Sequence, residues 1–350
     1  MAVSGGIDSS TAAYKLKHEG YEVIGVYLDL WKGFADSENV QKAEKITEEK
    51  LSRLSHELNF TIQVIDKKDA FYQRIVTYFI DSLKNGLTPN PCVVCNKHIK
   101  FQALFDTLLQ MDADYIATGH YARTRRKKDG GVLLLKGRDQ SKDQSYYLGL
   151  LEQGVLQRTI FPLGDTQKKE VKAFYKKEID PLADISESQD LCFLSGKDYR
   201  AFLQLYEPGS MQPGNILNVH GEILGKHTGL AFYTIGQRKG LQVQSNEPYF
   251  VIQKDRDSNT LLVGHLEELG RNYFCLKQVN WISGISAIDE KQYDVKIRYR
   301  AKPTRAKGKM MAGQKDMEIT TLKKLRDITP GQFAVLYHGD SVIAAGEISL

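Results

Sequence analysis

Apolar and polar positions alternate in two different ways along the first third of the chain. Short runs rich in β-branched and aromatic residues are typical of buried strands, and they occupy residues 21–28, 61–65 and 114–118. Longer segments carry apolar residues at helical spacing, and they occupy residues 36–59, 69–83 and 97–110. This alternation predicts a parallel β-sheet with helices on both faces.

The pattern changes after about residue 206. Gly, Pro and Asn become frequent and the strands are short, which indicates a small β-rich domain. Further strands are predicted at 295–300, 318–322, 333–337 and 342–348, and such short strands separated by turns favour a compact barrel. We therefore predict an α/β domain at 1–203, a central β-rich domain at 204–275 and a C-terminal β-barrel at 276–350.

The net charge of the chain is concentrated at one end. The formal charge is +5, and residues 276–350 account for all of it, with 13 Lys and Arg against 8 Asp and Glu. A basic end on a neutral body fits a polyanionic partner, and a solvated lysine-rich surface explains it equally well. No apolar run approaches the roughly 20 residues of a membrane span, and no secretory signal is present. We therefore expect a cytoplasmic protein with no membrane partner.

The sequence SGGIDSS, residues 4–10, lies between a three-residue apolar stub and a helical pattern. Paired glycines let the backbone approach a ligand closely, and the amides of a helix N-terminus attract anions. The stretch lacks the lysine of a GxxxxGK[ST] loop and the spacing of GxGxxG. It predicts a phosphate-holding loop, and the alternative is a plain Gly-Gly turn capped by Asp8 or Ser9. We expect the stub, residues 1–3, to be poorly anchored as a central strand.

The chain contains four cysteines, Cys92, Cys95, Cys192 and Cys275. In a reducing compartment they should be thiols, metal ligands or catalytic groups rather than structural disulfides. Cys92 and Cys95 form a CxxC pair that follows two prolines, which is typical of a redox, metal-binding or nucleophilic site. We expect a helix to begin near Cys95, which would lower the pKa of its thiol.

Six stretches, in family order, give the chain a resemblance to the tRNA-specific 2-thiouridylases. The first, SGGIDS, resembles the pyrophosphate loop of the ATP pyrophosphatase superfamily. The others are TPNPCVVCNKHIKF at 88–101, ATGHYA at 117–122, KDQSYYL at 142–148, SESQDLCFL at 186–194 and FYTIGQRKGL at 232–241. The resemblance implies a catalytic Rossmann-like domain of the adenine nucleotide alpha hydrolase type, followed by a β-rich domain and a C-terminal β-barrel that binds tRNA.

The resemblance also implies a sulfurtransferase reaction. ATP with Mg²⁺ would adenylate the C2 carbonyl oxygen of uridine 34, the wobble base of a tRNA anticodon stem-loop. Cys192 would carry sulfur as a persulfide, which a cysteine desulfurase or a sulfur-relay protein delivers. Cys95 would be the nucleophile that attacks this persulfide, leaving a Cys95–Cys192 disulfide that an external reductant resets.

The matched positions imply two sets of binding residues. Those for the nucleotide are Ala2, Val3, Ser4, Gly5, Gly6, Ile7, Asp8, Ser9, Leu28 and Gly119. Those for tRNA are Asn90, Pro91, Cys92, His120, Lys142, Asp143, Gln144, Arg298, Tyr299 and Gln332. The nucleotide set falls at C-terminal strand ends, where open α/β sheets bind ligands. Within the tRNA set, Asn90 to Cys92 would line a flipped base, and Tyr299 lies among basic residues, as phosphate binding with stacking requires.

One position departs from the family pattern. Many members have an aspartate where this chain has Cys92, and a thiol cannot simply take over the acid–base role of that carboxylate. Cys92, Cys95 and Cys192 could instead hold a [4Fe–4S] cluster that binds sulfide, which is the mechanistic alternative to the persulfide. No other metal site is expected. A hypothesis of a different class is a nucleotide-gated tRNA-binding or sulfur-relay protein without turnover.

Overall fold

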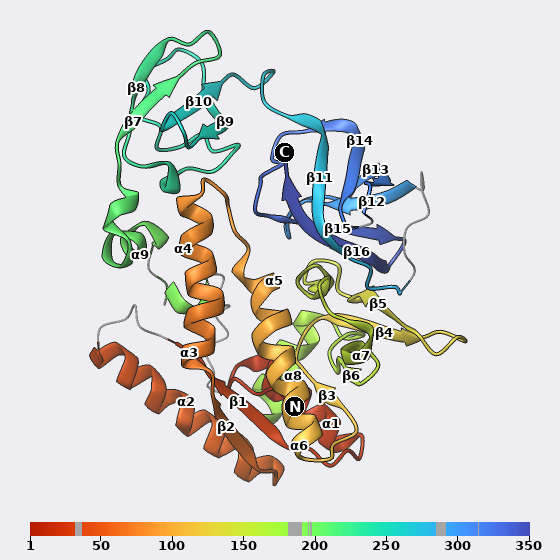
Figure 1. The fold of residues 1–350 in the computed structure, drawn as a ribbon. Coiled ribbons are helices and arrows are strands. Elements are labelled where there is room, and N and C mark those ends of the chain that lie inside the picture. The colour runs from red at the N-terminus through yellow and green to blue at the C-terminus, as the bar shows by residue number, and fades with distance from the viewer. Residues whose placement is uncertain (32–36, 181–190, 195, 197, 285–291, 314) are drawn as a thin grey trace.

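The computed structural model describes residues 1–31, 37–180, 191–194, 196, 198–284, 292–313 and 315–350. The α/β domain lies at one end of the molecule, and the two β-rich domains lie side by side at the other (Figure 1). The predicted succession of a Rossmann-like domain, a β-rich domain and a β-barrel is confirmed.

The α/β domain is built from short strands and longer helices. Its strands are β1 (Gly25–Asp29), β2 (Ile62–Asp66), β3 (Ile116–Ala117), β4 (Ala122–Arg126), β5 (Val132–Lys136) and β6 (Thr159–Ile160). Its α-helices are α1 (Ile7–His18), α2 (Ser37–Leu58), α3 (Lys68–Phe71), α4 (Thr77–Lys84), α5 (Pro91–Cys95), α6 (Gln102–Gln110), α7 (Gln153–Leu156), α8 (Lys168–Glu178) and α9 (Tyr199–Tyr206). Its wider π turns and short 3₁₀ turns are η1 (Tyr72–Val76), η2 (Asn96–Phe101), η3 (Ser145–Leu148) and η4 (Cys192–Leu194).

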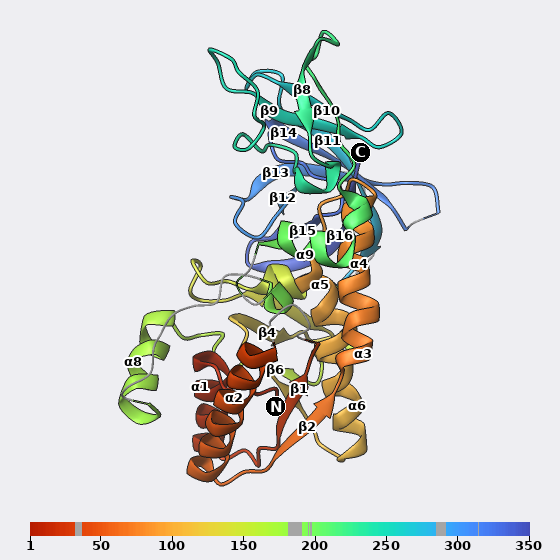
Figure 2. The same ribbon diagram turned by 90° about the vertical axis from the view of Figure 1, so that its left-hand side faces the viewer.

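A parallel sheet forms the centre of this domain, in the strand order β2, β1, residues 1–3, β3, β6. β1 pairs with β2 and β3 pairs with β6, both in parallel. The Ala2 amide donates to the Ala117 carbonyl and the Val3 amide to the Val26 carbonyl, each at 2.9 Å, so residues 1–3 join the two pairs. Helices α1 and α2 cover one face and α6 the other (Figure 2). The strand order reverses between residues 1–3 and β3, which is where such sheets bind ligands.

Two local expectations about this domain are wrong. Residues 1–3 are well anchored, because hydrogen bonds hold them on both sides and the Val3 side chain is only 3% exposed. The cysteine-bearing helix begins at Pro91 rather than near Cys95, because proline is well suited to the first position of a helix, where its missing N–H is not needed. Helices α5, η2 and α6 therefore run on from residue 91 to residue 110.

The central domain is a small antiparallel and parallel sheet in the order β8, β7, β10, β9. Its strands are β7 (Gly214–Leu217), β8 (Ile223–His227), β9 (Phe250–Asp255) and β10 (Thr260–Gly264). Two 3₁₀ turns accompany them, η5 (Pro208–Ser210) and η6 (Leu230–Phe232).

The C-terminal domain is the predicted barrel. Its strands are β11 (Arg271–Asn280), β12 (Gln292–Lys296), β13 (Thr304–Met310), β14 (Met317–Leu325), β15 (Phe333–His338) and β16 (Ser341–Ser349). Pairing between β11 and β16 closes the ring. The strand predicted at 295–300 stops at Lys296, so Arg298 and Tyr299 lie in the turn that follows it.

The β4–β5 hairpin belongs to the N-terminal domain but extends the sheet of the barrel, because Leu135 pairs with Ser341. A shared core supports this junction. Buried Leu134 and Tyr146 pack in one cluster with Val335 and Tyr337 of β15. The barrel is thus fixed to the α/β domain by backbone pairing and by apolar burial together.

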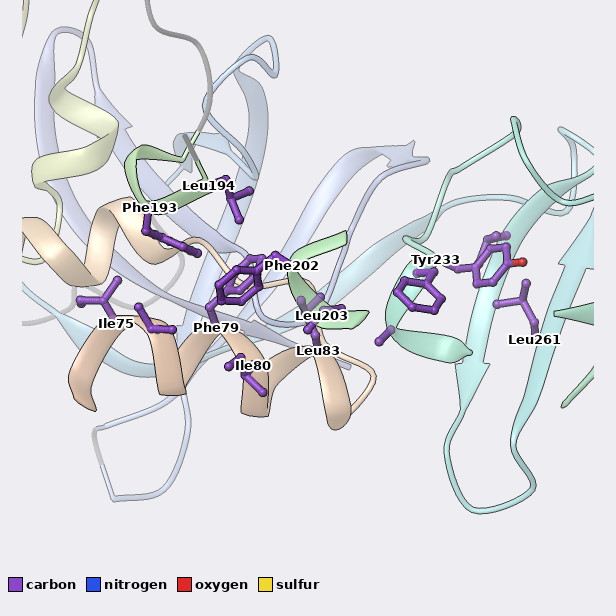
Figure 3. Close-up of a cluster of buried hydrophobic side chains, with 14 of the residues drawn as sticks. Ile75, Phe79, Ile80, Leu83, Phe193, Leu194, Phe202, Leu203, Tyr233 and Leu261 are labelled. Atoms are coloured by element: carbon purple, nitrogen blue, oxygen red, sulfur yellow. The ribbon is translucent and has the colours of Figure 1, made fainter. Parts of the chain in front are cut away.

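A second core holds η4 in place (Figure 3). Phe193 is 1% exposed, and its ring packs against Phe79 of α4 at 5.3 Å and Phe202 of α9 at 5.6 Å between centroids. Leu194 lies in the same cluster. Because both residues that follow Cys192 are buried in this core, the backbone position of Cys192 is set by apolar packing. Within the described residues, no helix has the length and apolar character needed to cross a bilayer.

Candidate functional site

The loop at residues 4–6 leads directly into α1. Gly5 has φ +70°, a backbone conformation that favours glycine. Gly6 is the N-cap of α1, and no side chain caps the helix, so the alternative of a turn capped by Asp8 or Ser9 is wrong. The Ser9 hydroxyl instead donates to the Gly6 carbonyl and accepts from the Ser4 amide, both at 3.1 Å. The uncapped amides at the start of α1 remain suited to an anion.

Gly119 supports this loop from the neighbouring strand end. A Cβ on Gly119 would lie 3.0 Å from the Asp8 carbonyl carbon and 3.1 Å from the Ser9 nitrogen. The loop therefore packs directly on a position that only glycine fills without displacing it. Ala2 and Val3 lead into the loop, and Leu28 lies in β1, so the expected nucleotide residues gather at the point where the strand order reverses.

Asp8 is held by two residues from distant parts of the chain. The Lys168 ammonium donates to both carboxylate oxygens, at 2.6 and 2.7 Å. The Tyr121 hydroxyl donates to Oδ1 at 2.7 Å. Lys168 also lies 5.5 Å from the centre of the Tyr121 ring, so the three side chains form one compact cluster beside the loop.

A cleft of about 1070 Å³ opens at this cluster and extends to the barrel. Residues of the loop and of the expected tRNA set line it together. The lining residues are Ser4, Gly6, Ile7, Asp8, Ser9, Asn90, Tyr121, Ser141, Lys142, Gln144, Tyr147, Lys168, Arg298, Tyr299, Arg300 and Gln332. Four of these are Lys or Arg, which suits the cleft to a phosphate-bearing ligand.

The barrel side of the cleft is tied to the TPNP segment. The Gln332 amide donates to the carbonyls of Thr88 and Pro89, at 2.9 and 3.2 Å. The Thr88 amide donates to the Pro330 carbonyl at 2.9 Å. Asn90 follows directly, so contacts from the barrel set the position of the residues expected to line a flipped base.

Tyr299 forms an aromatic wall with Tyr147, at 4.6 Å between ring centroids. Arg298 pairs with Asp327.

The Gln144 side chain accepts from the Tyr121 amide at 2.9 Å. Asp143 is only 4% exposed, and its Oδ1 accepts from the amides of Gly137 and Ser145, so this carboxylate shapes the turn that presents its two neighbours.

His120 lies beside the cleft rather than along its lining. Its Nδ1 is 2.9 Å from the Thr118 hydroxyl, and its ring is 6.0 Å from that of Phe101. Burial, assisted by the Lys100 ammonium, lowers the pKa of His120 to about 3. The imidazole is therefore neutral at physiological pH and acts there as a hydrogen-bonding group rather than as a cation.

The three cysteines of the candidate site lie in one neighbourhood. Cys95 packs in one buried cluster with Phe193 and Leu194, the residues that directly follow Cys192, and a charge on Cys192 raises the pKa of both Cys92 and Cys95. All four cysteines are free thiols, and Cys192 is the exposed member of the group while Cys95 is buried. Cys192 follows Cys92 and Cys95 by about 100 positions in the chain, so the fold brings them together.

The expectation that Cys95 is a ready thiolate is wrong. Cys95 ends α5 instead of beginning a helix, so it has no helix N-terminus beside it. Burial raises the pKa of Cys95 to about 12 and that of Cys92 to about 11. Burial of its thiol also raises the pKa of Cys192, although the residue as a whole is exposed. All three thiols are therefore protonated at neutral pH in this state.

Lys100 opposes this effect of burial, since its ammonium lowers the pKa of all three thiols. It lies in η2, a π turn. In an α-helix Lys100 would stand about 140° from Cys95 around the axis, whereas the roughly 80° per residue of a π turn reduces this angle to about 40°. The wider turn thus places the cation on the thiol side of the helix.

Family models match the chain in succession. They are the tRNA methyl transferase HUP domain at residues 1–196, the tRNA methyl transferase PRC-barrel domain at 200–265 and the aminomethyltransferase beta-barrel domain at 271–348. A protein named tRNA-specific 2-thiouridylase MnmA in Ligilactobacillus salivarius is 39% identical over 99% of this chain and 94% of its own length. Proteins of that name in Moorella thermoacetica and, numbered MnmA 1, in Caldanaerobacter subterraneus are each 40% identical over 99% of this chain, and 98% and 96% of theirs.

The chain belongs to the tRNA-specific 2-thiouridylase family. Among solved structures, the U34-tRNA thiolase NcsA from Methanococcus maripaludis with its [4Fe-4S] cluster matches at a TM-score of 0.32 and 19% identity, over 60% of this chain and 66% of that one. A likeness this low carries no argument about the site of this 2-thiouridylase family member.

Three thiols of this family member, those of Cys92, Cys95 and Cys192, are the candidate ligands for a cluster. Within the described residues, which include Cys92, Cys95 and Cys192, no three His, Cys, Asp or Glu side chains are arranged to hold a metal ion. The donor set as placed therefore does not fit a resident [4Fe–4S] cluster.

Sequence reasoning missed Lys168, Tyr121 and Lys100. Lys168 and Tyr121 reach the loop only through the tertiary fold, 160 and 113 positions from Asp8. No spacing rule finds such a pair. Lys100 follows Cys95 by five residues, a separation that an α-helix would place on another face. Tyr121 and Lys100 lay inside matched stretches, and that was the one available signal for them.

Proposed function

We propose that this protein is an ATP-dependent tRNA-uridine 2-sulfurtransferase that thiolates the wobble uridine, U34. The observation that carries the proposal is a cleft lined both by the loop at the start of α1 and by Asn90, Tyr299 and Gln332. ATP can activate a base of the RNA only if its triphosphate and the target nucleotide bind in the same cleft. The names of the relatives, tRNA-specific 2-thiouridylases, support the same reaction.

The first step is adenylation. The C2 carbonyl oxygen of uridine attacks the α-phosphorus of ATP, pyrophosphate leaves, and the oxygen becomes part of a good leaving group, AMP. The uncapped amides of α1 hold the phosphates. Mg²⁺ accompanying ATP needs only one or two protein carboxylates beside phosphate oxygens, and Asp8 fits that need. Residues Ala2 to Ser9, Leu28 and Gly119 form the nucleotide site.

The second step transfers sulfur. Cys192, loaded as a persulfide by a desulfurase or relay protein, is attacked at its inner sulfur by the Cys95 thiolate. The outer sulfur leaves as hydrosulfide, adds to C2 and expels AMP. The two thiols are oxidised to a Cys95–Cys192 disulfide while the sulfane sulfur is reduced, and an external dithiol restores them. The exposure of Cys192 suits loading by a partner, and the burial of Cys95 suits protection of the nucleophile.

Deprotonation of Cys95 is the demanding part of this step, because its pKa is about 12 in the resting state. Lys100 is the cation positioned to stabilise the thiolate. The tRNA set, Asn90, Pro91, Cys92, His120, Lys142, Asp143, Gln144, Arg298, Tyr299 and Gln332, would position the base and the anticodon stem-loop. The family descriptions mention methyl transfer. We do not propose that reaction, because methyl transfer needs neither a pyrophosphate loop nor paired thiols.

The proposal is tested by incubating unmodified tRNA with the protein, Mg-ATP, cysteine, a cysteine desulfurase and a dithiol reductant. Nuclease digestion and mass spectrometry should then show ATP-dependent 2-thiouridine at position 34. Tight ATP-dependent tRNA binding without 2-thiouridine would favour a non-catalytic binding or relay protein instead. Omitting the desulfurase while supplying sulfide separates the persulfide route from direct use of sulfide.

A further inference from the structure

The loop at residues 4–6 contains no lysine, yet it faces one. A phosphate held by the amides of α1 would lie beside the Asp8 carboxylate, and the two negative charges would repel each other. Lys168 neutralises Asp8 through both carboxylate oxygens. We propose that Lys168 is a phosphate-binding residue, which supplies from α8 the cation that other nucleotide loops carry in their own sequence. This inference rests on the proposed function.

Several contacts fix the position of Lys168. It is the first residue of α8, whose start is fixed by a capping box between Gln167 and Glu170. The Lys168 amide donates to the Asp139 carboxylate at 3.0 Å. Val171 is fully buried against Ala12 of α1 in one cluster, so the two helices are packed together at this end. The ammonium is thereby directed to the loop.

The ion pair has the features of an exchangeable contact. The Lys168 side chain is 11% exposed and the Asp8 side chain 35% exposed, and both line the cleft. A carboxylate–ammonium pair at such a place adds little net stability, because desolvation offsets the attraction. When the phosphates of ATP arrive, the ammonium can exchange one carboxylate oxygen for a phosphate oxygen. Tyr121 still donates to Asp8, which leaves the carboxylate held and available to Mg²⁺.

Arg298, another cation of the cleft, is engaged elsewhere. Arg298 belongs to the turn after β12 and pairs with Asp327 on the barrel. Lys168 is bonded to Asp8, in the first turn of α1 directly after the loop. We therefore assign it to the pyrophosphate part of ATP, the part released as product, and not to the adenosine or the α-phosphate.

The test is equilibrium binding of Mg-ATP, pyrophosphate and AMP by calorimetry to the full-length wild type and to Lys168→Met, Lys168→Arg and Lys169→Met. Lys169 is the matched control, since it is the next residue and is exposed. Lys168→Met should weaken binding of ATP and of pyrophosphate by about 10- to 100-fold, as loss of a charge-assisted hydrogen bond implies, and AMP by less than about 3-fold. Lys168→Arg should retain part of the affinity, and Lys169→Met all of it.

The possible results distinguish a phosphate-binding role of Lys168 from a structural one. ATP affinity of Lys168→Met equal to that of the wild type would overturn the inference and leave the proposed function standing. An equal loss for AMP and ATP, together with a lower melting temperature, would also overturn it, because the pair would then be structural. A wild-type protein that binds neither ATP nor pyrophosphate would contradict the proposed function itself.

Discussion

Gln332, in the turn before β15 of the barrel, donates from its side chain to the backbone carbonyl of Thr88 in the N-terminal domain, at 2.9 Å. A second bond from the same amide to Pro89 makes this a two-point clasp. Two residues 244 positions apart thus join the domain expected to bind tRNA to the segment expected to hold its target base.

Replacing Gln332 with Ala should loosen this clasp. Loss of two hydrogen bonds, each worth about 0.5–1.5 kcal/mol, should lower kcat/KM for tRNA by about 5- to 100-fold. The affinity for ATP should be unchanged, because the loop at α1 has its own supports. Steady-state thiolation kinetics and nucleotide binding measure the two effects, with the exposed Gln110→Ala as a control. A parallel loss of ATP affinity would contradict a local role for this clasp.

Gly119→Ala should displace the loop. The added Cβ would lie 3.0–3.1 Å from the backbone of Asp8 and Ser9, which is too close for an undisturbed contact. Overpacking typically costs about 1–3 kcal/mol, so we expect ATP to bind about 5- to 100-fold more weakly. Gly154→Ala, where no atom lies within 4 Å of the new Cβ, should bind ATP normally. Normal ATP binding by both variants would show that the loop tolerates the shift.

Cys192→Ser should abolish formation of 2-thiouridine while leaving ATP-dependent release of pyrophosphate within about threefold of the wild type. The reason is that serine cannot carry the sulfane sulfur, whereas adenylation does not use the thiol. Cys275→Ser, a change on β11 of the barrel, serves as the control. Pyrophosphate release and nucleoside mass spectrometry are the measurements. Retained thiolation in Cys192→Ser would remove its assigned role.

The raised thiol pKa values predict an unusual pH dependence of alkylation. A group with a raised pKa is more protonated at a given pH, so fewer thiolates are available at pH 7 than in an ordinary cysteine. Labelling of the exposed Cys192 by iodoacetamide should therefore be slow at pH 7 and still rise above pH 9. Cys95, with a pKa of about 12, should show the same continued rise at a lower rate because it is buried. A plateau near pH 8 in peptide mass spectra would disprove this assignment.

Lys100→Met should make the thiols still less acidic, since its ammonium lowers the pKa of Cys92, Cys95 and Cys192. We expect slower alkylation of Cys192 at pH 8, by about 2- to 10-fold, and slower sulfur transfer with unchanged adenylation. Lys100→Arg should preserve most of the rate. Lys97→Met is a suitable control, because Lys97 pairs with Glu152 and lines a different cavity. Equal labelling rates in Lys100→Met and wild type would argue against this role.

Local pattern alone determined much of this protein. Apolar periodicity located the strands and helices of the α/β domain and the succession of two β-rich domains, because burial on one face leaves a period in the sequence. The Gly-Gly stretch located the loop at the start of α1, and the matched stretches marked Cys92, Cys95 and Cys192 as candidate site residues. All of these features can be recognised from the local order of residues along the chain.

Tertiary structure decided what distant residues do together. It joined the β4–β5 hairpin to the barrel, clasped Gln332 to Thr88 and brought Lys168 to Asp8. It also reversed the expected acidity of Cys95, because that thiol is buried at the end of a helix that Pro91 begins. Burial and through-space charge depend on which segments pack against one another, and no window of neighbouring residues contains that information.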